Sequence, residues 1–264
     1  KLLNMLYVTT PEAYLSKDGQ NVVVSVQKEE MFRIPIINLE GIVTFGYMGA
    51  SPGLMKLCAD NGVSLTFLSP NGRFVARVQG QVRGNVLLRK EQYRIADDDS
   101  RALHFARLFI AGKIQNYRTT LQRFVRDNGE NVKVEAAIKY MEHSKQWALN
   151  ATSTSQLIGV EGGAANTYFG VFPELILNQK EDFPFHGRNR HPPKDKVNAM
   201  LSFVYTLITN ETAAALETVG LDPYVGFLHT LRPGRTSLAL DLMEEMRAYL
   251  GDRLVLSLIN RKQM

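Results

Sequence analysis

The sequence predicts an α+β protein with two domains, a small N-terminal β domain that carries one short helix and a larger all-α C-terminal domain. Up to about residue 82, apolar residues form short runs or alternate with polar ones, and turn residues separate the runs, a pattern typical of strands. From about residue 85 the apolar residues recur every three to four positions, which is typical of amphipathic helices. The predicted division is therefore residues 1–84 and 85–264. A chain of 264 residues has ample length for such cores.

The β domain is predicted from its apolar runs and its turn residues. Asp18-Gly19 predicts a hairpin turn, and Pro70-Asn71-Gly72 predicts the turn between the last two strands. Ser51-Pro52 predicts a helix start with Ser51 as N-cap and Pro52 at the first helical position, and Asn61-Gly62 predicts its end. The expected strands lie at residues 6–9, 22–26, 32–36, 41–45, 63–68 and 74–78.

The α domain is predicted from helical periodicity and its punctuation. Asp97-Asp98-Asp99-Ser100 precedes an apolar-periodic stretch and predicts a helix N-cap, because carboxylates at that end accept backbone N–H groups and interact favourably with the helix dipole. Gly220-Leu221-Asp222-Pro223 predicts a helix end and a turn. Helical stretches are expected at residues 102–114, 133–149, 153–178, 194–219 and 238–250.

Composition limits the classes of function. The net charge of +5 favours a polyanionic partner. Cys58 is the only cysteine, which excludes an internal disulfide framework and a CxxC zinc site and fits a cytoplasmic location. No apolar run reaches the roughly 18 residues that span a bilayer, so we expect no membrane association. The N-terminus shows no signal-peptide pattern.

The most informative residues lie near the end of the chain. His229 lies in a turn rich in basic residues, and Asp241, Glu244 and Glu245 follow at the spacing i, i+3, i+4. This spacing places the three carboxylates on one face of a helix, where like charges repel. A nearby cation removes that repulsion, and oxygen ligands with one imidazole suit a divalent ion such as Mg²⁺ or Mn²⁺.

A further carboxylate, Glu161, lies far upstream among small residues. The glycines and alanines around it allow another backbone or a ligand to approach closely. Taken alone, Glu161 is better explained as a surface or capping glutamate.

Together, these segments carry a resemblance to a known family. Glu161 in Gly-Val-Glu-Gly, His229 in Gly-Phe-Leu-His, and Leu-Ala-Leu-Asp-Leu-Met-Glu-Glu at 238–245 resemble the three motifs of CRISPR-associated protein one, the integrase of spacer acquisition. The similarity also includes residues 38–43, 63–65 and 201–207, and it is closest to the subtype I-C branch.

The resemblance implies a divalent metal, Mg²⁺ or Mn²⁺, bound by Glu161, His229 and Glu244. Asp241 would support the metal or the DNA end. Glu245 would contact the metal ligands or form a salt bridge instead of binding the metal. It implies joining of DNA 3′-hydroxyl ends to a repeat by transesterification. It also implies a homodimer formed through the β domain, a complex with CRISPR-associated protein two, and a C-terminal tail beyond Met264.

The expected DNA contacts are arginines in or beside loops, because a guanidinium binds phosphate in a bidentate manner. They are Arg83, Arg188, Arg190, Arg232 and Arg235. An ordinary solvated loop is the competing explanation for each basic run. Two other functions stay open, a metal-dependent endonuclease for branched or single-stranded DNA and a DNA-binding subunit without catalysis.

Overall fold

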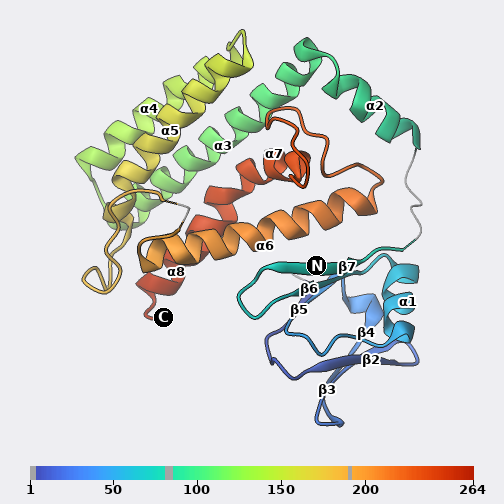
Figure 1. Cartoon of the computed structure of the whole chain (residues 1–264). Helices are drawn as coiled ribbons and strands as arrows, with labels where there is room; N and C mark the ends of the chain where they lie inside the picture. The colour runs from blue at the N-terminus through green and yellow to red at the C-terminus, as the bar shows by residue number, and fades with distance from the viewer. Residues whose placement is uncertain (1–3, 81–85, 190–191) are drawn as a thin grey trace. The chain divides into compact units, whose positions relative to one another are not determined.

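The structure is a computed structural model that describes residues 4–80, 86–189 and 192–264. The chain divides into two units, Lys1–Asn85 with Glu217–Gly220, and Val86–Leu216 with Leu221–Met264. The first unit holds the strands and the second is helical (Figure 1). The predicted class, a β-rich N-terminal part with one short α-helix followed by a larger helical part, is confirmed.

Two sheets form the first unit. The larger sheet has the order β1-β5-β6-β7, in which β1, β5 and β6 are parallel and β7 is antiparallel to β6. Its strands are β1 (Met5–Val8), β5 (Gly41–Phe45), β6 (Ser64–Leu68) and β7 (Phe74–Val78). The smaller sheet is an antiparallel meander of β2 (Tyr14–Asp18), β3 (Asn21–Val26) and β4 (Glu29–Pro35). Every residue of the inner strand β5 is buried, as expected for a strand in the middle of a parallel sheet.

Local signals placed the short helix and the turns of this unit correctly. Helix α1 (Pro52–Asn61) begins at Ser51, whose hydroxyl accepts a hydrogen bond from the Leu54 N–H at 3.1 Å, and ends at Gly62 with φ +68°. The expected strand at 32–36 is displaced, because Ile36 begins a short 3-10 turn, η1 (Ile36–Asn38), and its N–H donates to the Gln20 carbonyl.

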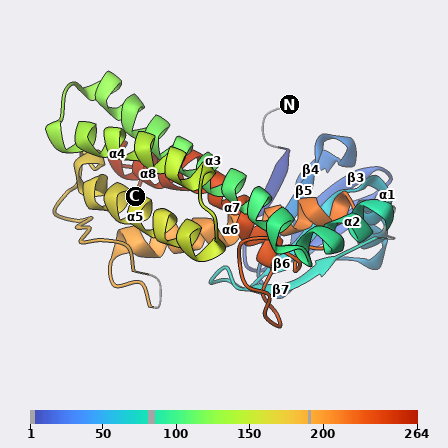
Figure 2. The same cartoon turned by 90° about the horizontal axis from the view of Figure 1, so that it is seen from above.

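The second unit is built around the long helix α3 (Asp99–Asn128). Asp98 caps this helix, as predicted, and accepts hydrogen bonds from the N–H groups of Ser100 and Arg101. Helix α3 contacts α2 (Val86–Ala96), α4 (Val132–Leu149), α5 (Thr154–Leu175) and α7 (Ser237–Met246), and α4 and α5 run alongside it in both views (Figures 1 and 2). Helix α6 covers Lys196–Thr218. No helix in the described part of the chain is both long and apolar enough to cross a bilayer.

The helix predicted at 238–250 extends too far, because the α-helix ends earlier in the structure. Helix α7 stops at Met246 and is followed by a π-helical segment, η2 (Arg247–Asp252), and by α8 (Arg253–Asn260). The wider turn brings Gly251 against the ring of Tyr205, where a Cβ atom would lie 2.9 Å from a ring carbon. Single π-helical turns of this kind are frequent beside functional sites.

A buried polar contact lies at this π-helical turn. The Tyr205 hydroxyl donates a hydrogen bond of 2.5 Å to Oδ1 of Asp252, which is fully buried. Burial raises the pKa of Asp252 to about 6, although the hydroxyls of Tyr205 and Tyr168 and the charge of Arg247 act in the opposite direction. Tyr168 and Tyr205 are core residues, as expected, and Tyr168 stacks on Tyr117 with ring centroids 3.9 Å apart.

Asp252 makes the stability of the protein depend on pH. Its pKa rises from 3.8 to about 6 on folding, so between about pH 4 and pH 6 the folded state binds the proton more tightly, and this contribution to the free energy of unfolding is lost as the pH rises. Asp252→Asn keeps an acceptor for Tyr205 and removes the titration. We expect the stability of the variant relative to wild type to rise by up to about 3 kcal/mol over this range and to stay level above it. Urea unfolding at a series of pH values measures this difference, and parallel curves for the two proteins would contradict it.

Candidate functional site

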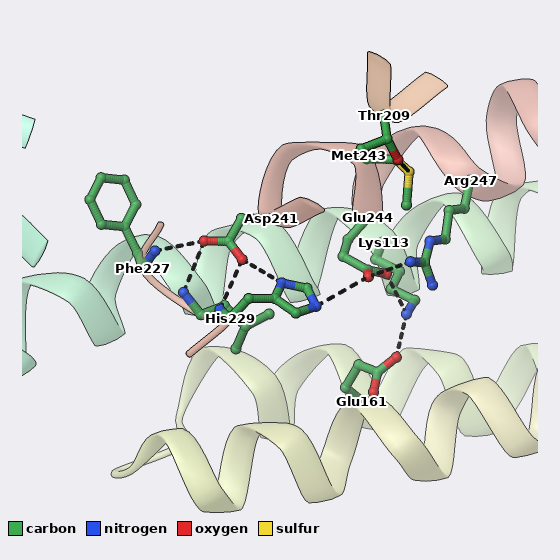
Figure 3. A network of polar contacts seen from close by, with 10 residues as sticks. Lys113, Glu161, Thr209, Phe227, His229, Asp241, Met243, Glu244 and Arg247 are labelled. Atoms are coloured by element: carbon green, nitrogen blue, oxygen red, sulfur yellow. Dashed lines mark hydrogen bonds and ion pairs between the residues drawn. The ribbon is translucent and has the colours of Figure 1, made fainter. Parts of the chain in front are cut away.

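The four predicted catalytic residues come together in the helical unit, although they lie up to 83 positions apart in the chain (Figure 3). Glu161 lies on α5, His229 lies in the loop between α6 and α7, and Asp241 and Glu244 lie on α7. Nε2 of His229 is 4.0 Å from Oε1 of Glu244. One buried lysine, Lys113 of α3, contacts the carboxylates of both Glu161 and Glu244. Side chains from three helices and one loop therefore meet at one place.

Asp241 is fully buried and uses both carboxylate oxygens to hold the His229 loop. Oδ2 accepts hydrogen bonds from the N–H groups of Phe227 (2.6 Å) and Leu228 (3.0 Å), and Oδ1 accepts one from the N–H of His229 (3.0 Å). Nδ1 of the His229 ring lies 2.6 Å from the same Oδ1. Because a carboxylate only accepts hydrogen bonds, this contact places a proton on Nδ1, and Nε2 lies on the side of Glu244. Asp241 thus positions His229 and has no oxygen left over for a metal.

The loop before His229 is held from a second side. Gln92 of α2 is buried, and its Nε2 donates to the carbonyls of Asp222 (2.7 Å) and Val225 (2.8 Å). The contact with Asp241 also requires a glycine at 226, since a Cβ atom there would lie 2.6 Å from Oδ2 of Asp241 and 2.7 Å from the backbone of Ser237. The direction of His229 is therefore fixed by backbone contacts on both sides.

Lys113 is the site residue that reasoning from the sequence missed. Its side chain is only 2% exposed, and its Nζ forms ion pairs with Oε1 of Glu161 and, at 2.6 Å, with Oε2 of Glu244 (Figure 3). The other oxygen of Glu244 lies 3.0 Å from Nη2 of Arg247, a second buried cation. A signal was present in the sequence, because Lys113 occupies a core position in an apolar stripe of α3 that otherwise consists of Ala106, Ile110, Tyr117 and Leu121.

These contacts shift the ionisation of both partners. Burial by itself would raise the pKa of Glu244, but the charges of Lys113 and Arg247 outweigh it and lower the pKa to about 2. Burial would likewise lower the pKa of Lys113, but the charge of Glu244 outweighs it and the pKa is raised. Both groups are therefore charged at neutral pH.

The residue types at the site suit a divalent ion, but their side chains are not arranged around one metal position. Two carboxylates and one imidazole are ligands for Mg²⁺ or Mn²⁺. However, in residues 4–80, 86–189 and 192–264 no group of three His, Cys, Asp or Glu side chains is placed to hold a metal ion. Between Glu161 and Glu244, where two ligands would share an ion, lies the ammonium group of Lys113.

The small residues around Glu161 leave its surroundings open on one side. A Cβ atom at Gly159 or Gly162 would meet no heavy atom within 4 Å, whereas one at Gly163 would lie 2.8 Å from the hydroxyl of Tyr140. Two of these glycines therefore border open space rather than another backbone, and Glu161 itself is partly exposed.

The predicted DNA-binding arginines differ in their surroundings. Arg83 and Arg190 lie outside the described residues. Arg188 is partly buried, and its guanidinium donates to Oδ1 of Asn198 (2.8 Å) and Oγ of Ser202 (3.1 Å), so it also braces its own loop against α6. Arg232 is exposed and Arg235 is partly exposed, and both lie in the turn that follows His229.

The close approach of Gly226 to Asp241 can be tested with a matched pair of glycine variants. Gly226→Ala forces a methyl group against the Asp241 carboxylate and the backbone of Ser237, so we expect it to lower the free energy of unfolding by about 2–4 kcal/mol. Gly162→Ala, in open space on a helix, should be neutral or stabilising by up to about 1 kcal/mol. Chemical denaturation measures both effects. Equal stabilities for the two variants would show that the loop is not held as described.

Comparisons with known proteins identify the family of this chain. A sequence model described as "CRISPR associated protein Cas1" matches residues 6–264. The CRISPR-associated endonuclease Cas1 1 of Chlorobaculum tepidum is 50% identical over 268 residues, which cover 100% of this chain and 78% of the relative. A casposase bound to integration product has a TM-score of 0.80 at 25% identity and covers 99% of this chain and 74% of that one.

The fold also recurs in a Cas6-RT-Cas1–Cas2 complex, with a TM-score of 0.76 at 23% identity, over 98% of this chain and 28% of that one. The subtype I-C assignment stays a prediction. The extent of the family match and the identity to the Chlorobaculum relative together show that the chain belongs to the Cas1 family of CRISPR-associated proteins.

Proposed function

We propose that this protein is a metal-dependent DNA integrase and endonuclease of CRISPR spacer acquisition, which joins the 3′-hydroxyl ends of short DNA duplexes to the repeat. The observation that carries the proposal is the convergence of Glu161, His229 and Glu244 from α5, the loop and α7. Membership of the Cas1 family supports it, and so does the likeness to a casposase bound to integration product.

The chain's own residues would bind and orient the reacting groups. Glu161, His229 and Glu244 would hold a divalent ion, Mg²⁺ or Mn²⁺, and Asp241 would keep Nε2 of His229 pointed toward it through the Nδ1 contact. Arg247 would keep Glu244 in place through its contact with Oε1. When bound, the ion would polarise the phosphodiester and lower the pKa of the attacking hydroxyl.

We propose further that DNA is held mainly through its phosphates. Arg232 and Arg235 lie in the turn that follows His229, which contains Gly234 with φ +76°, and Arg188 lies on a separate loop. Arg83 and Arg190 remain in the proposal on the strength of the sequence alone. Binding through phosphates would be indifferent to base sequence and would weaken as salt rises.

Two protein partners belong to the proposal. The part at residues 1–84 would form a homodimer, and the part at 85–264 would carry catalysis. The protein would act together with CRISPR-associated protein two, and support comes from the Cas1 family membership and the structural likeness to a Cas6-RT-Cas1–Cas2 complex. Such an assembly would hold both ends of one duplex, which a single active site cannot do.

The direct test is joining of a labelled duplex with free 3′-hydroxyls to a supercoiled plasmid, with Mg²⁺ or Mn²⁺ and with and without CRISPR-associated protein two. We expect His229→Ala to lower the joining rate by about 100-fold or more, because a metal ligand is removed. His104→Ala, an exposed histidine on α3, is the matched control and should keep wild-type activity.

The alternative functions give other results in this assay. Cutting without joining, even with the partner present, would replace the integrase proposal with a metal-dependent nuclease. DNA binding without either reaction would leave a binding subunit.

The DNA contacts can be tested separately from catalysis. We expect the double variant Arg232→Ala/Arg235→Ala to bind duplex DNA more weakly and to reduce the slope of log K against log salt by about 1.8, since each lost phosphate contact removes about 0.9. Fluorescence anisotropy over a salt series measures the slope. Arg123→Ala, whose Nε pairs with Asp127 on the same helix, is the control. An unchanged slope in the double variant would remove this turn from the DNA interface.

A further inference from the structure

The position of Lys113 suggests a role that the donor residues alone do not reveal. Its ammonium contacts one oxygen of Glu161 and one of Glu244, the two carboxylates that come from different helices. A divalent ion shared by Glu161 and Glu244 would draw on the same two carboxylates and on the space between them. Lysine and metal are therefore alternatives at the same place.

The charges of the buried group lead to the same conclusion. The negative charges of Glu161 and Glu244 are already matched by the positive charges of Lys113 and Arg247. Adding a divalent cation without moving Lys113 would leave a surplus of positive charge in a region where the lysine side chain is only 2% exposed. Like charges at such short range repel strongly in a poorly solvated environment.

We infer that Lys113 is a built-in cation that occupies the proposed metal position and competes with the divalent ion for Glu161 and Glu244. This role rests on the proposed metal site and goes beyond it, because Lys113 of α3 would lower the affinity of that site for the ion. Lys113 would also have a structural role, since the ammonium holds the two carboxylates together when the ion is absent.

The surroundings of Lys113 allow the exchange. Its ammonium sits on a flexible four-carbon stem, which can move without a change in the helix backbone. Nζ already lies over the Tyr117 ring, 5.6 Å from its centroid, so an ammonium that moves away from the carboxylates while staying over this ring keeps a favourable neighbour. Glu244 keeps its contact with Arg247 after Lys113 has moved, so the carboxylate stays oriented for the ion.

The test is the affinity of the full chain for Mn²⁺, measured without DNA by electron paramagnetic resonance of the free ion. Lys113→Met removes the charge and keeps most of the volume. We expect this variant to bind Mn²⁺ about tenfold more tightly than wild type, since the competing charge is gone. Lys145→Met is the matched control, because Lys145 is partly buried on the neighbouring helix and its Nζ donates to Gln115 instead of a carboxylate, so its affinity should equal that of wild type.

A second readout tests the structural half of the inference. Without metal, Lys113→Met leaves two carboxylates facing one another, so its melting temperature should lie below that of wild type. Added Mn²⁺ should raise the melting temperature of this variant more than that of wild type, because stabilisation by a ligand grows with its affinity. The extra substitution Glu161→Gln in the Lys113→Met protein should weaken Mn²⁺ binding again, which places the ion at this site.

The outcomes separate this inference from the proposed function. Equal or weaker Mn²⁺ binding by Lys113→Met, with binding by wild type intact, would overturn the competition and leave the metal site standing. Absence of Mn²⁺ binding by all of these proteins would overturn the metal site and the competition together.

Wild-type protein provides a measurement that does not depend on the folding of Lys113→Met. In protein labelled with ¹⁵N-lysine, a buried, ion-paired ammonium exchanges its protons slowly and gives its own NMR signal, which Lys113→Arg would identify by its loss. Added Mg²⁺ should shift or broaden this signal with the same midpoint as metal binding. A signal unchanged at saturating Mg²⁺ would overturn the competition.

Discussion

The site depends on one buried ion-pair cluster, in which Lys113 of α3 meets Glu161 of α5 and Glu244 of α7. Three helices from separate parts of the chain meet at this point, and charges that are costly to bury alone are paired there. Gly112, next to Lys113, lets α7 lie close against α3. A Cβ atom at this position would lie 2.9 Å from the Glu245 side chain. Packing and electrostatics therefore act on the same helix pair.

A division of labour between carboxylates follows from their surroundings. Asp241 is fully buried and is saturated by three backbone N–H groups and the His229 ring, so it sets the geometry of the loop. Glu244, one helical turn later, faces Lys113 and Arg247, and Glu161 is partly exposed beside open space at Gly162. Carboxylates of the same chemistry thus differ in their surroundings, because one accepts from backbone donors and the others face cations and solvent.

The helical unit buries several ionisable groups. Lys113, Glu244 and Arg247 are buried, and the π-helical turn that follows α7 places Asp252, another carboxylate, in a fully buried position against Tyr205. Burying an ionisable group is unfavourable unless it is paired, so such groups are concentrated where a protein binds ligands or moves charge. A ligand that replaces Lys113 would exchange one cation for another without exposing either carboxylate to an apolar environment.

The sequence by itself determined the two-part architecture, the caps at Ser51 and Asp98, and the residue types of the site, because these depend on periodicity and on local hydrogen bonding. The motifs with Glu161, His229 and Glu244 were likewise readable from the order of residues. Only the tertiary structure revealed that Lys113 lies between two of these side chains and that α7 continues into a π-helical turn. It also revealed that both oxygens of Asp241 accept hydrogen bonds from backbone N–H groups and the His229 ring. Each of these depends on atoms that are distant in the chain: Glu161 is 48 positions from Lys113, and Tyr205 is 47 from Asp252. Periodicity along one helix cannot show which charged groups another helix places opposite it.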